Sequence, residues 1–310
     1  MYHNSFRGTA GLLAACLMIL CCGCGNRGTD GLSEKPLYEP GKTHVLVPEA
    51  GQEDVLEAGP LTLDFSHMDQ GYFMGTLSSS DKKVNIQVIG PDQVTYKYFL
   101  SEEGVHSALP FTAGDGSYIV LAFEEAGGGQ YAALLSHSLT LELQNEFLPF
   151  LYPNQYVSFT PESEAVALAA QLTGSCETDL DALTAIYNYV TEHITYDDDK
   201  AANVETGYLP DIDETLRTGR GICFDYAALT CAMLRALSIP ARLNIGYSGD
   251  IRHAWVDIYI ESTGWVRNAV HFAGDEWELM DPTYASALDN DDLLKEYIGD
   301  GDNYTLLYVR

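Results

Sequence analysis

Apolar and polar residues alternate in short runs through the first half of the chain. Runs such as GYFMGTLS, VNIQVIG, VTYKYFL and SYIVLAF recur between Leu61 and Leu143, and turn-rich pieces such as SSSDKK and EEAGGGQ separate them. Alternation with a period of two, interrupted by turn residues, is typical of β-strands. About seven short strands in this stretch predict an antiparallel β-sandwich over residues 59–150, immunoglobulin-like in general plan.

From residue 163 the apolar residues follow a helical period instead. Residues 163–174 open with a serine and an acidic residue and end at a glycine, and residues 179–196 place their apolar side chains on one helix face. After a loop, the apolar run Phe224–Leu237 predicts a largely buried helix. The later segments HAWVDIYI and WELMDPTY predict strands. Residues 155–310 are therefore expected to form a second domain, of the α+β class.

The start of the chain has a different character. Its apolar run, Gly8–Leu20, is too short to span a membrane and ends just before Gly23 and Cys24. This pattern resembles a bacterial lipoprotein signal peptide over residues 1–23, after which Cys24 would carry the lipid. Cys21 stands where such signals usually have leucine, Cys22 is a second candidate for the lipid, and an ordinary secretory signal is the alternative. The Gly- and Pro-rich residues 24–58 then predict a flexible tether.

The acidic composition of the chain makes some classes of binding partner unsuitable. The net charge is −29, and removal of residues 1–23 would delete one basic residue and change it to −30. So acidic a chain is poorly suited to nucleic acid or to an anionic lipid surface, and the charge is explained most simply by solubility. Three thiols besides Cys24 would remain after processing, an odd number that does not indicate a disulfide framework. The processed chain would contain no CxxC pair of the kind that binds zinc, and we expect no metal and no cofactor.

Two cysteines of the apolar run differ in position. Cys223 follows Gly219 and Gly221 and lies at the predicted start of the helix, where unpaired backbone N–H groups and the helix dipole favour a thiolate. The negative charge of Asp225 nearby opposes this, so a base must supply most of the activation. Cys231 lies in mid-helix, about 12 Å further along the axis, too far for a disulfide with Cys223. Its position indicates a small buried core residue.

Other candidate residues occur before and after this helix. His253 begins a predicted strand, on its less apolar face, where an imidazole would stay accessible. Asp281 ends a later strand, where a carboxylate can orient an imidazole. Trp255, on the same face as His253, shields the imidazole or simply packs. Trp255 and the loop residue Tyr208 are also candidates for lining a cleft or donating to an oxyanion. Taken singly, His253 is also compatible with a structural histidine and Asp281 with a turn residue.

Together these residues resemble the transglutaminase-like superfamily of cysteine enzymes. Four motifs occur in the family's order: Gly221-Ile222-Cys223, Ser238-Ile239-Pro240-Ala241-Arg242, His253-Ala254-Trp255 and Asp281-Pro282-Thr283. The resemblance implies a papain-like domain whose nucleophile helix packs on an antiparallel sheet, with Cys223 as nucleophile, His253 as base then acid, and Asp281 as its orienting partner. Ser238 stands where the family often has glycine, and the segment between the last two motifs is longer than usual.

Such a triad would carry out acyl transfer through a thioacyl intermediate. We expect hydrolysis of peptide or amide bonds in a protein or peptide substrate at the cell surface, with a membrane anchor through the N-terminal lipid. Protein cross-linking by transamidation is the first alternative, and a catalytically inactive surface binding or scaffold module is an alternative of another class. A metal site built on Cys223, His253 and Asp281 would need a fourth ligand that the motifs do not supply. The sequence leaves the oligomeric state open.

Overall fold

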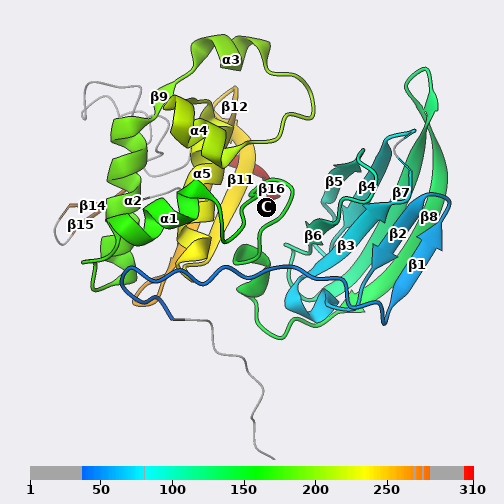
Figure 1. The fold of residues 1–310 in the computed structure, drawn as a ribbon, viewed down its shortest axis with the longest axis horizontal. Coiled ribbons are helices and arrows are strands. Elements are labelled where there is room, and N and C mark those ends of the chain that lie inside the picture. Colours follow the sequence, from blue (N-terminus) through cyan, green and yellow to red (C-terminus); the bar gives the residue numbers. More distant parts are fainter. Residues whose placement is uncertain (1–36, 80, 268–269, 274–275, 280–303) are drawn as a thin grey trace, which may run out of the picture. The chain divides into compact units, whose positions relative to one another are not determined.

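The computed structural model describes residues 37–79, 81–267, 270–273, 276–279 and 304–310 (Figure 1). The predicted lipoprotein signal and Asp281 lie outside these ranges, and between residues 268 and 303 only the backbone of residues 270–273 and 276–279 is described. Within the described ranges, helices of the length and apolarity needed to cross a membrane are absent.

The first part of the described chain is built from two four-stranded antiparallel sheets. One has the order β1-β2-β3-β6 and the other the order β5-β4-β7-β8. Their strands are β1 (Val55–Ala58), β2 (Leu61–Asp64), β3 (Tyr72–Leu77), β4 (Val84–Ile89), β5 (Thr95–Leu100), β6 (Ser107–Pro110), β7 (Gly116–Gly127) and β8 (Gln130–Leu141). Two short 3-10 helices, η1 (Met68–Gln70) and η2 (Leu148–Phe150), complete this part.

Side chains from both sheets meet in one core, as the alternating pattern predicts. Strand β4 buries Val84, Ile86 and Val88 and leaves the residues between them partly exposed. These three side chains share a cluster with Leu63 of β2 and Phe73 of β3, which belong to the other sheet. The period of two therefore reports correctly which residues face inward.

The detailed plan of these sheets differs from the sequence prediction. In an immunoglobulin constant-type domain the first, second, fifth and fourth strands share a sheet, whereas here the order is β1-β2-β3-β6. The immunoglobulin-like assignment is therefore not confirmed. The segments YAALLS and LTLEL, expected as separate strands, belong largely to the single long strand β8, because the polar residues between them continue its pairing with β7.

The second part combines helices with another antiparallel sheet. Its helices are α1 (Glu164–Leu172), α2 (Asp179–His193), α3 (Asp198–Asn203), α4 (Ile212–Thr218) and α5 (Cys223–Ala236). The main sheet has the order β13-β12-β11-β16, from β11 (Ala241–Ser248), β12 (Ile251–Ile260), β13 (Gly264–Val266) and β16 (Tyr304–Val309). Two small pairs add β9 (Thr195–Tyr196) beside β10 (Arg220–Gly221) and β14 (Val270–Ala273) beside β15 (Glu276–Leu279).

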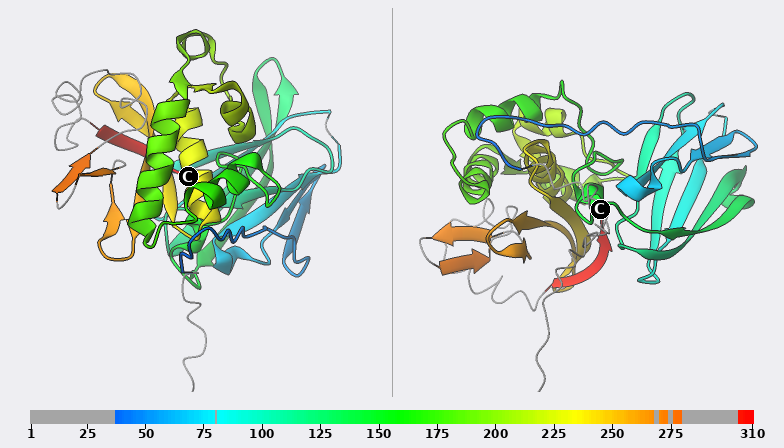
Figure 2. Two further views of the ribbon diagram at one scale, coloured as in Figure 1. Left: turned by 60° about the vertical axis from the view of Figure 1, so that its left-hand side comes forward. Right: turned by 90° about the horizontal axis from the view of Figure 1, so that it is seen from below.

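Helix α5 is the central element of this part. Every residue from Asp225 to Ala236 is buried, which agrees with the predicted buried helix. One side of α5 packs on β11 and β12, while α1, α2 and α4 pack on its other sides (Figures 1 and 2). Helices α3 and α4 occupy a stretch that the sequence pattern indicated as loop, because both are too short for a helical period to stand out.

Residues 37–58, predicted as part of a flexible tether, are attached to the folded chain. The hydroxyl of Tyr38 donates to the carbonyl oxygens of Thr173 and Cys176, at 3.2 and 3.0 Å. The backbone N–H of His44 donates to the carbonyl oxygen of Ala236 at 2.7 Å. Composition indicates whether a segment forms regular structure, but it does not report single hydrogen bonds to distant residues. The predicted tether is therefore wrong for this stretch.

A tight turn ends α5 and leads into β11. The N–H of Ile239 donates to the carbonyl of Leu234 and the N–H of Ser238 to that of Arg235, each at 3.0 Å. This pair of bonds is a Schellman motif, which requires a left-handed residue just after the helix. Ser238 occupies that position with φ of 63°. The conformation accounts for the glycine that the family often has here.

We expect Ser238→Gly to raise the free energy of unfolding by about 0.5–1 kcal/mol, because glycine adopts the left-handed conformation without a Cβ clash. Urea unfolding followed by far-UV circular dichroism measures the change. Ser238→Ala is the matched control, since it removes the hydroxyl but keeps Cβ, and it should give no gain. An equal gain in both variants would contradict the backbone explanation.

Candidate active site

Cys223 is the first residue of helix α5, as the glycine-rich approach predicted. Gly219 adopts a left-handed conformation, with φ of 63°, and ends α4. A Cβ on Gly221 would lie 2.8 Å from the Cβ of Asp225, so only glycine lets the chain pass this close to the first turn of α5. The two glycines thus allow the chain to leave one helix and begin the next. Cys223 is partly exposed and in the reduced form.

Cys223 and His253 line the same pocket, although 30 residues separate them in sequence. The pocket has a volume of about 480 Å³. Its walls come from β9, from α3 and the loop after it, from the start of α5, and from strands β11 and β12. The lining residues include Tyr196, Glu205, Tyr208, Phe224, Ile245 and Arg252. A cleft of this size that contains a thiol and an imidazole is suited to a small segment of substrate.

His253 is more buried than the sequence indicated. Its side chain is 5% exposed, whereas the alternation along β12 predicted an accessible face. The ring of Trp255 stacks beside it at 6.4 Å between centroids, and the ring of Tyr304 from β16 lies 6.1 Å away. Because these aromatic rings cover the face that was expected to be open, His253 reaches solvent through the pocket.

Trp255 is a packing residue in this arrangement. It is 2% exposed, does not line the pocket, and meets the ring of Tyr304 edge-on at 5.0 Å. Of the two roles considered for it, shielding of the imidazole and simple packing, the contacts show both. A cleft-lining role finds no support among these contacts.

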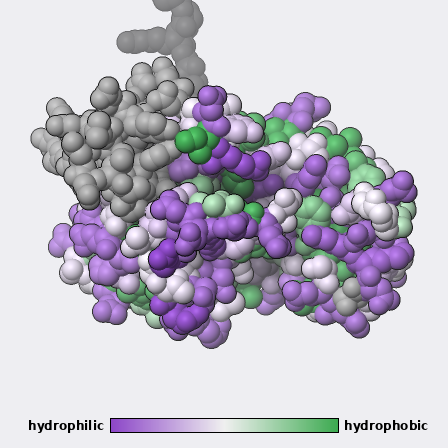
Figure 3. All heavy atoms as spheres, turned by 90° about the horizontal axis from the view of Figure 1, so that it is seen from above, coloured by the Kyte–Doolittle hydropathy of each residue, from purple (hydrophilic) through white to green (hydrophobic). Residues whose placement is uncertain are grey.

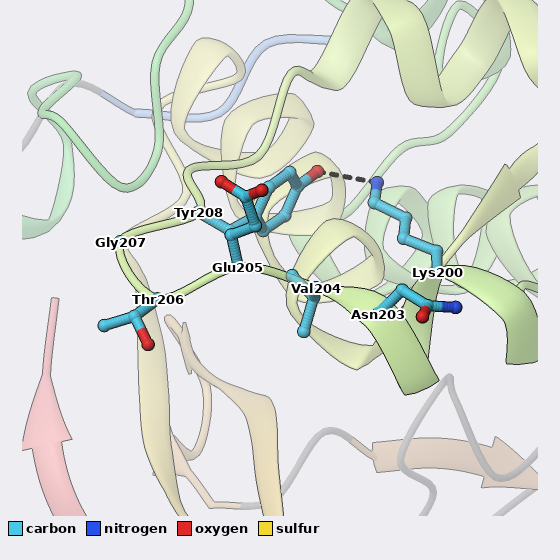
Figure 4. A pocket seen from close by; sticks show the side chains of 7 residues that line it. All are labelled: Lys200, Asn203, Val204, Glu205, Thr206, Gly207 and Tyr208. Atoms are coloured by element: carbon cyan, nitrogen blue, oxygen red, sulfur yellow. Dashed lines mark hydrogen bonds between the residues drawn. The ribbon is translucent and has the colours of Figure 1, made fainter.

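Tyr208 lines the pocket, but its hydroxyl is engaged elsewhere. It donates to Oδ1 of Asp225 and accepts from Nζ of Lys200 at 2.6 Å, the bond drawn in Figure 4. Burial and the neighbouring carboxylate of Asp225 raise the pKa of Tyr208, so the phenol stays protonated. With its single proton already donated to Asp225, Tyr208 is not placed to serve an oxyanion. Sequence reasoning missed Lys200, which had no signal besides its place in an acidic loop.

The segment that follows α3 borders two pockets. Residues 204–208 line the pocket of Cys223 and also a neighbouring pocket of about 470 Å³, shown in Figure 4. The second pocket contains Lys200 and Asn203 but neither Cys223 nor His253. This segment therefore forms a wall that the two pockets share.

Cys231 lies apart from this chemistry, as its mid-helix position predicted. Its side chain is fully buried in the core around α5. Burial raises the pKa of Cys231 to about 12, so the thiol remains protonated at neutral pH. No disulfide joins Cys223 to Cys231 among the described residues.

The position of Asp281 stays a prediction. Strand β15 ends at Leu279, two residues before Asp281, so the expected strand that leads to it is present. The residue itself lies outside the described ranges. The long segment between His253 and Asp281 contains the β14–β15 hairpin, whose backbone pairs Val270 with Leu279.

On the face shown in Figure 3, the coloured residues are largely hydrophilic, with apolar residues in small groups between them.

A thiol and an imidazole that line one pocket are residue types from which a cysteine nucleophile and its base can be built. Residues 166–268 match the family model of the transglutaminase-like superfamily. The chain therefore contains a transglutaminase-like domain, and the resemblance inferred from its motifs is confirmed. The matched range contains Cys223 and His253 and ends before Asp281.

Two curated proteins are similar to part of the chain. The chain is 28% identical to the kyphoscoliosis peptidase of Homo sapiens over 163 residues, which is 49% of this chain and 22% of that protein. It is 27% identical to the kyphoscoliosis peptidase of Mus musculus over 141 residues, 42% of this chain and 19% of the relative. The match thus spans about a fifth of the length of these relatives.

Solved structures are similar at lower identity. A proposed cysteine protease from Cytophaga hutchinsonii is 15% identical with a TM-score of 0.37, over 77% of this chain and 83% of that one. The transglutaminase of red sea bream is 15% identical with a TM-score of 0.25, over 70% of this chain and 49% of that one.

The two cysteines of α5 should differ sharply towards a thiol alkylator. In the native protein at neutral pH we expect iodoacetamide to modify Cys223 on the order of a hundredfold faster than Cys231, because the latter is buried and protonated. Trypsin would release both in the peptide 221–235, and fragmentation of this peptide in a mass spectrometer separates them. Unfolding in urea should remove the difference, and equal rates in the native protein would contradict the assignment.

Proposed function

We propose that the protein is a cell-surface cysteine hydrolase that cleaves peptide or amide bonds through a thioacyl intermediate on Cys223. The observation that supports this most is the shared pocket, in which Cys223 of α5 and His253 of β12 both face the same cavity. The relatives named as peptidases favour hydrolysis, although the match covers only part of their length.

In the first step, the thiolate of Cys223 attacks the substrate carbonyl carbon and forms a tetrahedral intermediate. This intermediate collapses to the thioester as the carbon–nitrogen bond breaks, and the protonated ring of His253 gives its proton to the leaving amine. Water then attacks the thioester while His253 takes its proton. The carboxylic acid leaves, and the thiolate and imidazolium are restored.

Two further groups would assist these steps. The first backbone N–H groups of α5 have no partners within the helix and can donate to the oxyanion of the tetrahedral intermediate. Asp281 is proposed to accept a hydrogen bond from the ring of His253 and so hold the ring in its working tautomer.

The same intermediate is compatible with a different outcome. If an amine replaced water in the second half, the product would be a new amide and the protein a cross-linking transamidase. If no thioester formed at all, the domain would be an inactive binding or scaffold module. Both are outcomes that one experiment separates.

We expect the full chain to cleave members of a mixed peptide library in oxygen-labelled water, with the label incorporated into each new carboxylate. Cys223→Ala should abolish the products, and His253→Ala should lower the rate by about 10²–10⁴ because general acid–base catalysis is lost. Cys231→Ala is the matched control and should keep the activity, with a loss of about 1 kcal/mol in stability for a small core truncation. Mass spectrometry reads the products.

Addition of a primary alkylamine to the same reaction tests transamidation. Amine-capped products in excess of labelled carboxylates would replace hydrolysis by cross-linking as the function. Equal product formation by the parent and Cys223→Ala would rule out Cys223 as the nucleophile.

Location at the cell surface is a separate part of the proposal. It rests on the apolar run and the Gly23-Cys24 junction, which resemble a bacterial lipoprotein signal. A lipid on Cys24 would hold the domain on the outer side of a bacterial membrane, where extracellular peptides reach it.

Replacing Cys24 by Ser should then release the protein from the membrane fraction or leave it unprocessed. Metabolic labelling with a fatty acid, followed by membrane fractionation, measures both effects. Cys22→Ser is the matched control. Loss of the lipid in the control alone would move the modified residue to Cys22, and unchanged labelling in both variants would contradict lipidation at this motif.

A further inference from the structure

The side chains of Lys200, Tyr208 and Asp225 contact one another at the start of α5, and the carboxylate of Asp225 is fully buried. Asp225, the third residue of α5, is 0% exposed. Its Oδ2 accepts from the backbone N–H of Ile222 at 2.8 Å and from Nζ of Lys200 at 2.7 Å, and its Oδ1 accepts from the hydroxyl of Tyr208. The ammonium of Lys200 also lies 4.5 Å from the centre of the ring of Tyr208.

This carboxylate creates an electrostatic problem for the nucleophile. A negative charge two residues after Cys223 opposes formation of a second negative charge on its sulfur. The charge is also removed from water, so it depends on a partner within the protein. Lys200 of α3 provides the opposite charge, and Tyr208 of the following loop donates a hydrogen bond to the carboxylate. Figure 4 shows the side chains of Lys200 and Tyr208 and the hydrogen bond that joins them.

Other ionisable groups surround Cys223 from each neighbouring element. They are Lys200 of α3, Glu205 and Tyr208 of the following loop, Tyr196 of β9, Arg252 and His253 of β12, and Asp225 of α5 itself. Burial, followed by the proximity of Cys223, raises the pKa of Tyr196, which therefore remains neutral. Glu205 and Arg252 are exposed, so water screens their charges. Asp225 lies two residues from Cys223 and is fully buried, so water screens its charge less than those of Glu205 and Arg252.

We propose that Lys200 is a positioning residue for the reaction: with Tyr208 it compensates the buried carboxylate of Asp225, so that Cys223 can become a thiolate, and it ties the wall of the cleft to α5. This inference rests on the proposed function, in which that thiolate is the nucleophile. Because residues 204–208 line the pocket, the same contacts that balance the charge also set the position of this wall.

A mutant cycle on Lys200 and Asp225 tests the charge balance. The readout is the pH midpoint of Cys223 alkylation by iodoacetamide in the full chain, resolved from Cys231 by fragmentation of the peptide 221–235. Lys200→Met should shift the midpoint upward by about one pH unit, because the buried carboxylate loses its counter-charge. Asp225→Asn should shift it downward by less, since the ammonium of Lys200 is 30% exposed and can turn to solvent.

The double variant Lys200→Met, Asp225→Asn should return close to the parent midpoint, because both charges are gone. Lys200→Arg keeps the charge and should also stay close to the parent. Lys82→Met is the matched control, since Lys82 pairs with Glu124 at 2.6 Å in the β-sheet part of the chain and should leave the midpoint unchanged.

A purely structural role would give a different pattern. All variants of the pair would then shift in one direction, with the double variant furthest from the parent, and that result would overturn the proposal. An unchanged midpoint in Lys200→Met would overturn it as well. If Lys200→Met does not fold, the step from Asp225→Asn to the double variant carries the test, and it must raise the midpoint. Alkylation needs no substrate, so its result is independent of the hydrolysis assay. The midpoint shifts can be observed when no hydrolysis is found, and hydrolysis can be found when the midpoint does not shift.

Discussion

The burial of helix α5 is the constraint on which the rest of this domain depends. A buried helix can carry a charged side chain only where hydrogen bonds compensate it. Arg235, near the end of α5, is 1% exposed, and its guanidinium donates to the carbonyl oxygens of Ala241, Tyr152 and Arg310 at 2.8–3.0 Å. Burial lowers the pKa of Arg235 to about 10, which leaves it charged at neutral pH. One cation thus joins α5 to β11, to the segment before α1, and to the residue that follows β16.

Each end of α5 has one buried charged side chain that depends on hydrogen bonds, positive at Arg235 and negative at Asp225. Arg235 is satisfied by backbone carbonyls close to the Schellman turn, while Asp225 at the other end is satisfied by a lysine, a tyrosine and a backbone N–H. With both ends held, the first residue of the helix is displayed at a defined place in the pocket wall. The sheet that packs on α5 presents His253 to the same pocket. The hydrogen bonds that compensate Arg235 and Asp225 therefore also fix the position of α5, and with it that of Cys223, relative to the sheet.

Local patterns in the sequence predicted much of this arrangement. The apolar run of α5 and the alternation in β12 placed Cys223 and His253 on their elements, because burial imposes the helical and strand periods directly. Lys200 escaped prediction because its partner, Asp225, lies 25 residues away and meets it only when α3 folds over α5. The attachment of Tyr38 escaped for the same reason. The burial of His253 depends on Trp255 and on Tyr304 from β16, a strand distant in sequence.

The central claim is that Cys223 forms a covalent bond with the acyl group of a substrate. The most direct measurement of this bond is mass spectrometry of the peptide 221–235. The full chain first reacts with an activated peptide ester and is quenched with acid within one turnover. We expect a mass increase equal to the acyl group, located on Cys223 by fragmentation and lost on treatment with hydroxylamine. An acyl group on Cys231 or on another residue, or turnover without any acylated peptide in the parent or in His253→Ala, would show that Cys223 is not the nucleophile.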